Sequence, residues 1–231
     1  MYNNHTISAV IPCYNEEEGV ARVIQSMPDI VDEILIVNNN SSDRTAEVAE
    51  SLGARVITEK RMGYGRAYKT GLEAAKGDII VTMDGDATYP TIAISYLVAL
   101  LSQDSLDFIS VWRVHINMES TMENYKRFYG NEILNIFMSV LFGMRIKDSQ
   151  SGMWVFKKEI LQKLNVTSDG MPFSEEIKIE AFKNKGIKTR EVPLYFDFLS
   201  RQGDSKLNLW KDGFRNLFFL FQKRFNIRNQ E

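Results

Sequence analysis

The sequence is poor in cysteine and contains no long apolar run. Cys13 is the one cysteine among 231 residues, which excludes an intrachain disulfide and favours a reducing compartment. The longest uncharged apolar run covers residues 133–144, whereas a membrane-spanning helix needs about 20 residues. Residues 1–5 carry neither a basic nor an apolar signal pattern, so we expect no secretory leader.

Common nucleotide-binding and zinc-binding motifs are also missing. No G-x-x-x-x-G-K-[ST] pattern is present, which excludes a P-loop NTPase by motif. Residues 12–16 (PCYNE) stand where a dinucleotide dehydrogenase would carry G-x-G-x-x-G. His5 and His115 are isolated, so no zinc spacing exists. With 28 basic and 30 acidic residues, the chain is not expected to bind nucleic acid.

Charge is unevenly distributed in a composition otherwise typical of a globular domain, with 44% hydrophobic and 25% charged residues. Residues 1–90 carry 8 basic and 14 acidic side chains, whereas residues 201–231 carry 7 and 3, and 7 of the 14 phenylalanines lie in the last 41 residues. We expect an acidic part that handles a cation and a basic end that meets an anionic or lipid surface. The simplest partition is a domain at residues 1–205 and an extension at residues 206–231.

Short apolar runs alternate with helical patterns in the first 90 residues. The patterns predict strands at residues 7–11, 33–37, 54–58 and 78–83. They predict helices at residues 17–27, 43–52 and 66–76. This alternation is typical of an α/β fold with a mostly parallel central sheet and helices on both faces. Residues 12–16, 38–43 and 84–89 then share the carboxyl edge of the sheet, where such folds bind ligands.

Two aspartates stand one residue apart after the fourth predicted strand. Asp84 and Asp86 would repel each other unless a cation lay between them, and Mg²⁺ or Mn²⁺ accepts such oxygen ligands. Gly85 between them would let the backbone approach a ligand closely. The alternative is a solvated turn before a helix that starts near Thr91, but the position at the sheet edge favours a metal site.

Several motifs follow one another in order. They are residues 10–16 (VIPCYNE), 37–45 (VNNNSSDRT), 63–67 (GYGRA), 75–78 (AKGD) and 83–86 (MDGD). Together they resemble the family 2 glycosyltransferases. Residues 148–152 (DSQSG) and 201–207 (RQGDSKL) narrow the resemblance to the dolichyl-phosphate mannose and glucose synthase branch, and it covers residues 7 to about 215. The resemblance implies a GT-A type fold and an inverting, metal-dependent transfer of a hexose from a UDP- or GDP-linked sugar to a polyprenyl or dolichyl phosphate.

The resemblance also implies roles for individual residues. Those expected in the nucleoside pocket are Pro12, Tyr14, Glu16 and Asn39, with Asn39 facing the base. Those expected to be catalytic are Asp84, Asp86 and Arg201, with both aspartates at the metal and the diphosphate. Those expected at the acceptor phosphate or the diphosphate are Arg113, Arg127, Ser151 and Lys206.

Two residues depart from the family pattern. Asn39 stands where the family usually has aspartate, and an amide that both donates and accepts favours uracil over guanine, hence a UDP-sugar. Thr88 stands where the mannose synthases often carry glutamine, and threonine is the poorer metal ligand. The expected metal shell is therefore weakened at Thr88, while the metal itself remains expected at Asp84 and Asp86.

The acceptor determines whether a base is needed. A lipid phosphate is already anionic, so no strong base is required for its attack. A hydroxyl acceptor on a sugar or another molecule would need one, and Glu175 or Glu176 is then the candidate. The same pair is equally explained as first-turn helix carboxylates. A third interpretation is a non-catalytic nucleotide-sugar-binding subunit, and the presence of both Asp84 and Asp86 argues against it.

The end of the chain predicts an amphipathic helix. Phenylalanines repeat at helical spacing between basic residues: Phe214, Phe218, Phe221 and Phe225, with Lys211, Arg215, Lys223 and Arg224. Such a helix lies in a headgroup layer or docks on its own domain, and the width of the apolar face favours a membrane or partner contact. Residues 131–142 predict a second interfacial helix. We expect a peripheral protein at the cytoplasmic face of a membrane, alone or held by a small membrane subunit.

Overall fold

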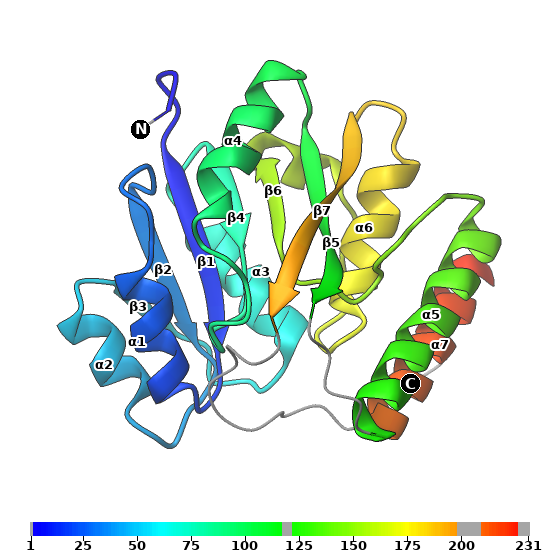
Figure 1. The fold of residues 1–231 in the computed structure, drawn as a ribbon, viewed down its shortest axis with the longest axis horizontal. Helices are drawn as coiled ribbons and strands as arrows, with labels where there is room; N and C mark the ends of the chain where they lie inside the picture. The colour runs from blue at the N-terminus through cyan, green and yellow to red at the C-terminus, as the bar shows by residue number, and fades with distance from the viewer. Residues whose placement is uncertain (1, 117–121, 198–208, 226–231) are drawn as a thin grey trace.

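The computed structural model describes residues 2–116, 122–197 and 209–225 (Figure 1). The strands in this part are β1 (Ile7–Cys13), β2 (Glu33–Asn38), β3 (Arg55–Thr58), β4 (Ile79–Thr82), β5 (Phe108–Ile116), β6 (Trp154–Lys157) and β7 (Thr189–Asp197). The helices are α1 (Glu17–Gln25), α2 (Thr45–Ser51), α3 (Tyr64–Ala74), α4 (Ala93–Gln103), α5 (Met122–Phe142), the 3-10 helix η1 (Lys158–Lys163), α6 (Phe173–Lys183) and α7 (Leu209–Phe225).

All seven of these strands form one sheet, in the order β3-β2-β1-β4-β6-β5-β7. β1 pairs in parallel with β2 and β4, and β2 pairs in parallel with β3. β6 runs antiparallel to β4 and β5, whereas β5 and β7 are parallel. The predicted mostly parallel sheet is therefore confirmed. The carboxyl ends of β1, β2 and β4 meet at one edge.

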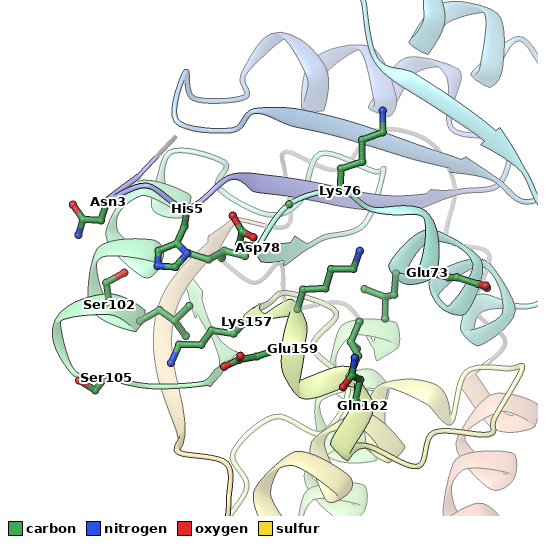
Figure 2. Close-up of a pocket in the computed structure, with 16 residues that line it drawn as sticks. Asn3, His5, Glu73, Lys76, Asp78, Ser102, Ser105, Lys157, Glu159 and Gln162 are labelled. Atoms are coloured by element: carbon green, nitrogen blue, oxygen red, sulfur yellow. The ribbon is translucent and has the colours of Figure 1, made fainter.

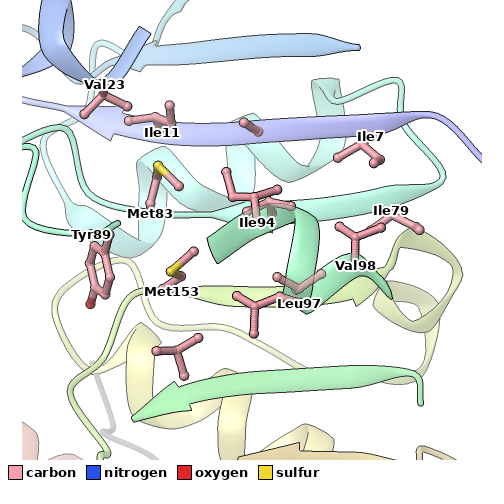
Figure 3. Packing of buried hydrophobic residues seen from close by; sticks show 14 of the residues in the cluster. Ile7, Ile11, Val23, Ile79, Met83, Tyr89, Ile94, Leu97, Val98 and Met153 are labelled. Atoms are coloured by element: carbon pink, nitrogen blue, oxygen red, sulfur yellow. The ribbon is translucent and has the colours of Figure 1, made fainter. Parts of the chain in front are cut away.

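The sheet is covered on both faces, as the alternation in β1 requires. Ile7, Ala9 and Ile11 point into one core cluster, with residues of α1 and α4, while Val10 points into the other, with residues of α3 and α6. Figure 3 shows the first cluster, in which Leu97 of α4 packs with strand residues such as Ile79. Burial of both faces explains why the strands read as continuous apolar runs.

A third core cluster joins the two long helices to α6. It contains Leu134, Met138 and Phe142 of α5, Ile179 of α6 and Leu220 of α7. α5 and α7 lie side by side at one flank of the molecule (Figure 1). α5 is the longest described helix, with 21 residues, and among the helices of the described ranges none combines the length and apolarity needed to cross a membrane.

The four strands predicted from the first 90 residues are present, and the helix predicted at 66–76 starts two residues earlier, at Tyr64. That earlier start depends on a distant loop. Arg66 N–H donates to the Asp169 carbonyl (2.9 Å) and Gly65 N–H to the Gly170 carbonyl (3.2 Å). A Cβ on Gly65 would lie 2.4 Å from the Ser168 carbonyl oxygen, so only glycine allows this approach.

Candidate active site

One cavity, of about 860 Å³, lies at the amino edge of the parallel strands (Figure 2). Two of its charged groups are held by neighbouring residues. Asp78 accepts hydrogen bonds from the N–H and the hydroxyl of Thr6, both at 2.9 Å, and Lys157 pairs with Asp107 at 2.8 Å. Because parallel sheets bind ligands at the carboxyl edge, the functional site is expected at the opposite end of the strands.

At the carboxyl edge, the loops after β1 and β2 are joined by hydrogen bonds. Asn15 N–H donates to Ser41 Oγ (3.0 Å), and Ser42 N–H donates to Asn15 Oδ1 (2.8 Å). Asn15 has a φ of 53°, in the left-handed region that asparagine tolerates. The two loops therefore form one connected surface.

The residues expected at the nucleoside lie on this surface. Pro12 is half-buried near the end of β1, and Tyr14 is 38% exposed just beyond it. Glu16 precedes α1, and its N–H donates to Thr45 Oγ1 (2.8 Å) of α2. The contacts of these three residues with a nucleoside stay predictions.

Asp84 and Asp86 follow β4 directly, and each has one oxygen held by a hydroxyl. Asp84 Oδ1 accepts from the Tyr64 hydroxyl at 3.2 Å. Asp86 is 6% exposed, and its Oδ1 accepts from the N–H (3.1 Å) and the hydroxyl (2.6 Å) of Thr88. Thr88, expected only as a poor metal ligand, therefore orients Asp86.

Negative charge is concentrated at this point of the edge. The pKa of the Cys13 thiol is raised well above its usual range, first by burial and then by Glu16, Asp84 and Asp86. A Cβ on Gly85 would lie 2.5 Å from Cys13 Sγ, so the turn between the aspartates is pressed against β1. This glycine is needed for packing rather than for approach to a ligand alone.

The donor set fits a hard divalent cation. Mg²⁺ is commonly held by one or two carboxylates and completes its shell with water and substrate phosphates. Across the described residues, no group of three or more histidine, cysteine, aspartate or glutamate side chains could hold a metal ion. An ion at Asp84 and Asp86 would have coordination positions left for water and substrate phosphate oxygens.

A second charged group lies in the loop of residues 148–152, which precedes β6. Asp148 binds Arg113 of β5 through two bonds, Nε–Oδ2 at 2.7 Å and Nη2–Oδ1 at 2.9 Å. Burial alone would raise the pKa of Asp148, but the charge and hydrogen bonds of Arg113, together with the charge of Lys178, lower it. Arg113, expected at an acceptor phosphate, thus has two of its donors on Asp148.

Lys178 of α6 is completely buried, and its ammonium group contacts the backbone of this loop. Its Nζ donates to the carbonyls of Asp148 (2.9 Å), Ser149 (2.8 Å) and Ser151 (2.7 Å). Burial lowers the pKa of Lys178 to about 7, although the charge of Asp148 opposes that shift. Sequence reasoning assigned Lys178 no role, because a lysine is rarely buried and no motif singles this one out.

Two tyrosines and a glycine connect the loop to the aspartates, and sequence reasoning assigned none of them a role at this site. Gly152 N–H donates to the Tyr89 hydroxyl (2.7 Å), which also lies 3.4 Å from Ser151 Oγ. A Cβ on Gly152 would lie 2.5 Å from the Tyr64 hydroxyl and 3.0 Å from Asp84 Oδ1. The motif at residues 148–152 could have indicated Gly152, since glycine commonly marks a close approach.

Asn39 does not present a free amide to a base in this structure, contrary to expectation. Its Nδ2 donates to the carbonyls of Glu59 (3.0 Å) and Arg61 (2.8 Å), and its Oδ1 accepts from Gly63 N–H (2.8 Å). Both donors therefore hold the loop after β3. The argument from Asn39 for uracil loses its physical support, because the donor that would distinguish the bases is engaged.

Glu175 and Glu176 lie in the first turn of α6, and both are completely buried. Glu176 accepts from the N–H groups of Thr167 (2.9 Å) and Ser168 (2.7 Å) and pairs with Lys223 at 3.0 Å, so it is a structural residue. Burial raises the pKa of Glu175 to about 8. Its Oε1 accepts from Gln150 at 2.7 Å, so it too faces the protein interior.

Four predicted site residues remain, and they are Ser151, Arg127, Arg201 and Lys206. Ser151 is completely buried, so direct contact with an acceptor would require its loop to open. Arg127 belongs to α5, but its side chain lies outside the described part. Arg201 and Lys206, and the predicted boundary at residues 205–206, lie outside the described residues.

The predicted amphipathic helix is present as α7, and it both docks and leaves an apolar side exposed. Leu220 is buried, and the ring of Phe221 packs on Phe137 of α5 with centroids 5.8 Å apart. Lys223 binds Glu176 rather than facing outward. The exposed apolar residues of the two helices, each 51–75% exposed, are Tyr129, Ile133, Ile136, Val140, Phe214, Phe218 and Phe225. We call these seven residues the apolar stripe.

Comparisons with known proteins agree with this geometry. A family model described as glycosyl transferase family 2 matches residues 8–164. A low-salt glycan biosynthesis hexosyltransferase of Haloferax volcanii is 30% identical over 93% of this chain, which spans about half (53%) of that protein. A dolichyl-phosphate hexose transferase of the same organism is 31% identical over 92% of this chain and 91% of its own length.

A solved structure shows the same fold. Glucosyl-3-phosphoglycerate synthase from Mycobacterium tuberculosis, crystallised with Mn²⁺, UDP and glucosyl-3-phosphoglycerate, superposes with a TM-score of 0.79 at 23% identity. The match covers 98% of this chain and 82% of that one. The α/β architecture expected from the sequence is thereby confirmed.

Proposed function

The chain belongs to glycosyltransferase family 2, in its dolichyl-phosphate sugar synthase-like branch, and we propose that it transfers a hexose from a UDP- or GDP-linked sugar to a polyprenyl or dolichyl phosphate. Its fold is of the GT-A type. One observation carries the proposal for the acceptor: α5 and α7, the helices of the apolar stripe, both form hydrogen bonds to the loop of residues 148–152, in which Asp148 holds Arg113. A lipid phosphate combines an apolar tail with an anionic head, which matches the two.

We propose that Asp84 and Asp86 hold Mg²⁺ or Mn²⁺ together with the donor diphosphate. The hydroxyls of Tyr64 and Thr88 orient the carboxylates for this role. The Mycobacterium tuberculosis neighbour was crystallised with Mn²⁺ and UDP, which supports the choice of ion. When bound, such an ion supplies positive charge against the developing charge of the leaving diphosphate.

The proposed reaction is a single displacement. An oxygen of the acceptor phosphate forms a bond to the anomeric carbon, the bond from that carbon to the diphosphate breaks, and the diphosphate leaves with the electron pair. The configuration at the anomeric carbon is inverted. The acceptor oxygen is already anionic, so no base is needed. This agrees with Glu175 and Glu176, the two candidate bases, being turned into the protein interior.

We propose that the apolar stripe rests on the membrane that holds the acceptor. Lys211, Arg215 and Arg224 are exposed on α7 beside it, and basic residues attract anionic headgroups. Anionic lipids are typical of the cytoplasmic leaflet, which supports a peripheral position at that face. A small membrane subunit could contact the same stripe and would then compete with vesicles for it.

A donor and acceptor assay tests the proposal. Purified protein is incubated with Mn²⁺, dolichyl phosphate in vesicles, and radiolabelled UDP- or GDP-hexoses, and dolichol without phosphate serves as the matched control acceptor. We expect label in the organic phase with dolichyl phosphate only, and competition between UDP and GDP identifies the donor base. Label confined to a water-soluble product would support a hydroxyl acceptor instead. Binding without transfer would support a non-catalytic nucleotide-sugar-binding subunit.

A further inference from the structure

Lys178 is a completely buried lysine whose ammonium is surrounded by backbone oxygen. Three carbonyls of one short loop converge on its Nζ at 2.7–2.9 Å, and the Ser174 hydroxyl lies 3.3 Å away. The Nζ also lies 5.8 Å from the centre of the Trp154 ring, within the range of a cation–π contact. An ammonium has three N–H donors, one for each carbonyl.

These contacts give the loop its shape. Three carbonyl dipoles that point toward one centre repel each other unless a cation or donors lie between them. The Ser174 hydroxyl assists, because it lies 3.1 Å from the carbonyl oxygens of both Ser149 and Ser151. One hydroxyl has a single hydrogen and cannot satisfy three acceptors. The turn at residues 148–151 therefore depends on Lys178.

The same loop holds the parts of the site around which an acceptor would bind. Asp148 at its start fixes the Arg113 guanidinium through two hydrogen bonds. Gly152 at its end donates to the Tyr89 hydroxyl and leaves no room for a Cβ beside Asp84. A shift of the turn would thus move the Arg113–Asp148 pair and the wall next to the aspartate.

Charged groups from several elements face Lys178. Burial and Arg113 lower the pKa of Lys178, whereas Asp148, which is paired with Arg113, and Glu191 of β7 raise it. Glu175, also on α6, keeps its proton near neutral pH because burial raises its pKa to about 8. The role of Lys178 therefore depends on its hydrogen bonds to the three loop carbonyls rather than on a net positive charge.

We propose that Lys178 is a positioning residue for the acceptor phosphate, acting through the loop of residues 148–152. The proposal rests on the proposed function, because it takes the acceptor to be a phosphate bound beside Arg113. Lys178 does not touch the acceptor. Its effect is to hold Asp148, and with it Arg113, at the place where the anionic head arrives.

Two variants of α6 separate this role from general stability. Lys178→Met keeps the length of the side chain but removes all three donors. Lys183→Met is the matched control, since Lys183 lies on the same helix and donates to a backbone carbonyl, that of Phe142 (3.0 Å), away from the loop. Ser174→Ala is a milder variant that removes the assisting hydroxyl, and it remains informative if Lys178→Met does not fold.

The full chain is compared by hydrogen exchange and by steady-state kinetics. For Lys178→Met we expect amide exchange at residues 148–154 to become at least tenfold faster, with exchange in β1 and β2 unchanged. We expect the KM for dolichyl phosphate to rise at least tenfold and the KM for the nucleotide sugar to stay within twofold. Ser174→Ala should shift both quantities in the same direction by a smaller factor, and Lys183→Met should match the wild type.

Two results would overturn the role of Lys178. One is unchanged exchange in the loop; the other is faster exchange accompanied by equal changes in both KM values, which would indicate a purely structural residue. If Lys178→Met does not fold, Ser174→Ala with wild-type values overturns it. Wild-type protein that transfers nothing to dolichyl phosphate would instead refute the proposed function, while the exchange data would still report on the loop.

Discussion

Replacing Asp86 by asparagine removes one charge from the candidate metal site with little change in structure. Asp86 Oδ1 holds the Thr88 N–H and hydroxyl at 3.1 and 2.6 Å. The side-chain carbonyl of an asparagine can accept the same two bonds. We therefore expect the free energy of unfolding of Asp86→Asn to lie within about 1 kcal/mol of the wild type.

The effect on transfer should be far larger. Positive charge against a leaving group contributes several kcal/mol to a transition state, and losing one such interaction commonly lowers kcat by about 10²–10³-fold. At about 1.4 kcal/mol per tenfold in rate, this corresponds to about 3–4 kcal/mol. The contrast between a small change in stability and a large change in rate distinguishes a site residue from a structural one.

The assay measures initial rates of lipid-linked product at saturating nucleotide sugar over a range of Mn²⁺ concentrations, with Mn²⁺ binding in the presence of UDP or GDP measured separately by calorimetry. Asp29→Asn is the matched control, because Asp29 is exposed in the turn between α1 and β2. We expect weaker Mn²⁺ binding and slow transfer for Asp86→Asn alone. A folded Asp86→Asn protein with a rate within tenfold of the wild type would refute the metal assignment.

Three further changes test other parts of the site. Glu175→Gln should remove a fall in unfolding free energy of up to about 4 kcal/mol between pH 5 and 8, measured by urea titration. Burial raises the folded-state pKa of Glu175 to about 8 from 4.5, so the folded protein retains a proton that the unfolded chain releases. Parallel pH curves for the variant and the wild type would contradict this. The double variant Phe214→Asp with Phe218→Asp should weaken vesicle binding at least 100-fold in flotation assays. Each exposed ring contributes about 1.5–3 kcal/mol when it is buried. Unchanged flotation would exclude the apolar stripe as the membrane contact. Gly152→Ala, whose Cβ would lie 3.0 Å from Asp84 Oδ1, should reduce turnover at least tenfold, and full activity would mean that the aspartate tolerates displacement.

The phenylalanine variants are preferable to truncation of the chain after Lys206. Leu220 of α7 is completely buried, and Lys223 reaches Glu176 and Glu180 of α6. Removing the helix would expose the third core cluster and leave a buried carboxylate without its partner. A loss of vesicle binding would then report on folding rather than on the membrane contact.

The strands and helices of the amino-terminal half were predictable because the sequence patterns that indicate them are local. The apolar runs that became β1 and β4 are bounded by polar residues, and the aspartates that follow β4 necessarily lie at its carboxyl end. Parallel pairing then gathers the loops after β1, β2 and β4 at one edge, whatever the details of packing. The family resemblance and the position of Asp84 and Asp86 depended on nothing more than order and spacing.

Which charged side chains are buried was decided only by the tertiary structure. The segment from Ser174 to Ile179 carries two glutamates and a lysine, residue types that are usually solvent-exposed, yet α6 lies against the sheet, α5 and α7 and buries all three. Likewise, the amide of Asn39 is engaged by a loop 20–22 residues further along the chain. Whether a polar group meets water, substrate or a backbone carbonyl depends on which distant segments pack around it, and no local pattern contains that information.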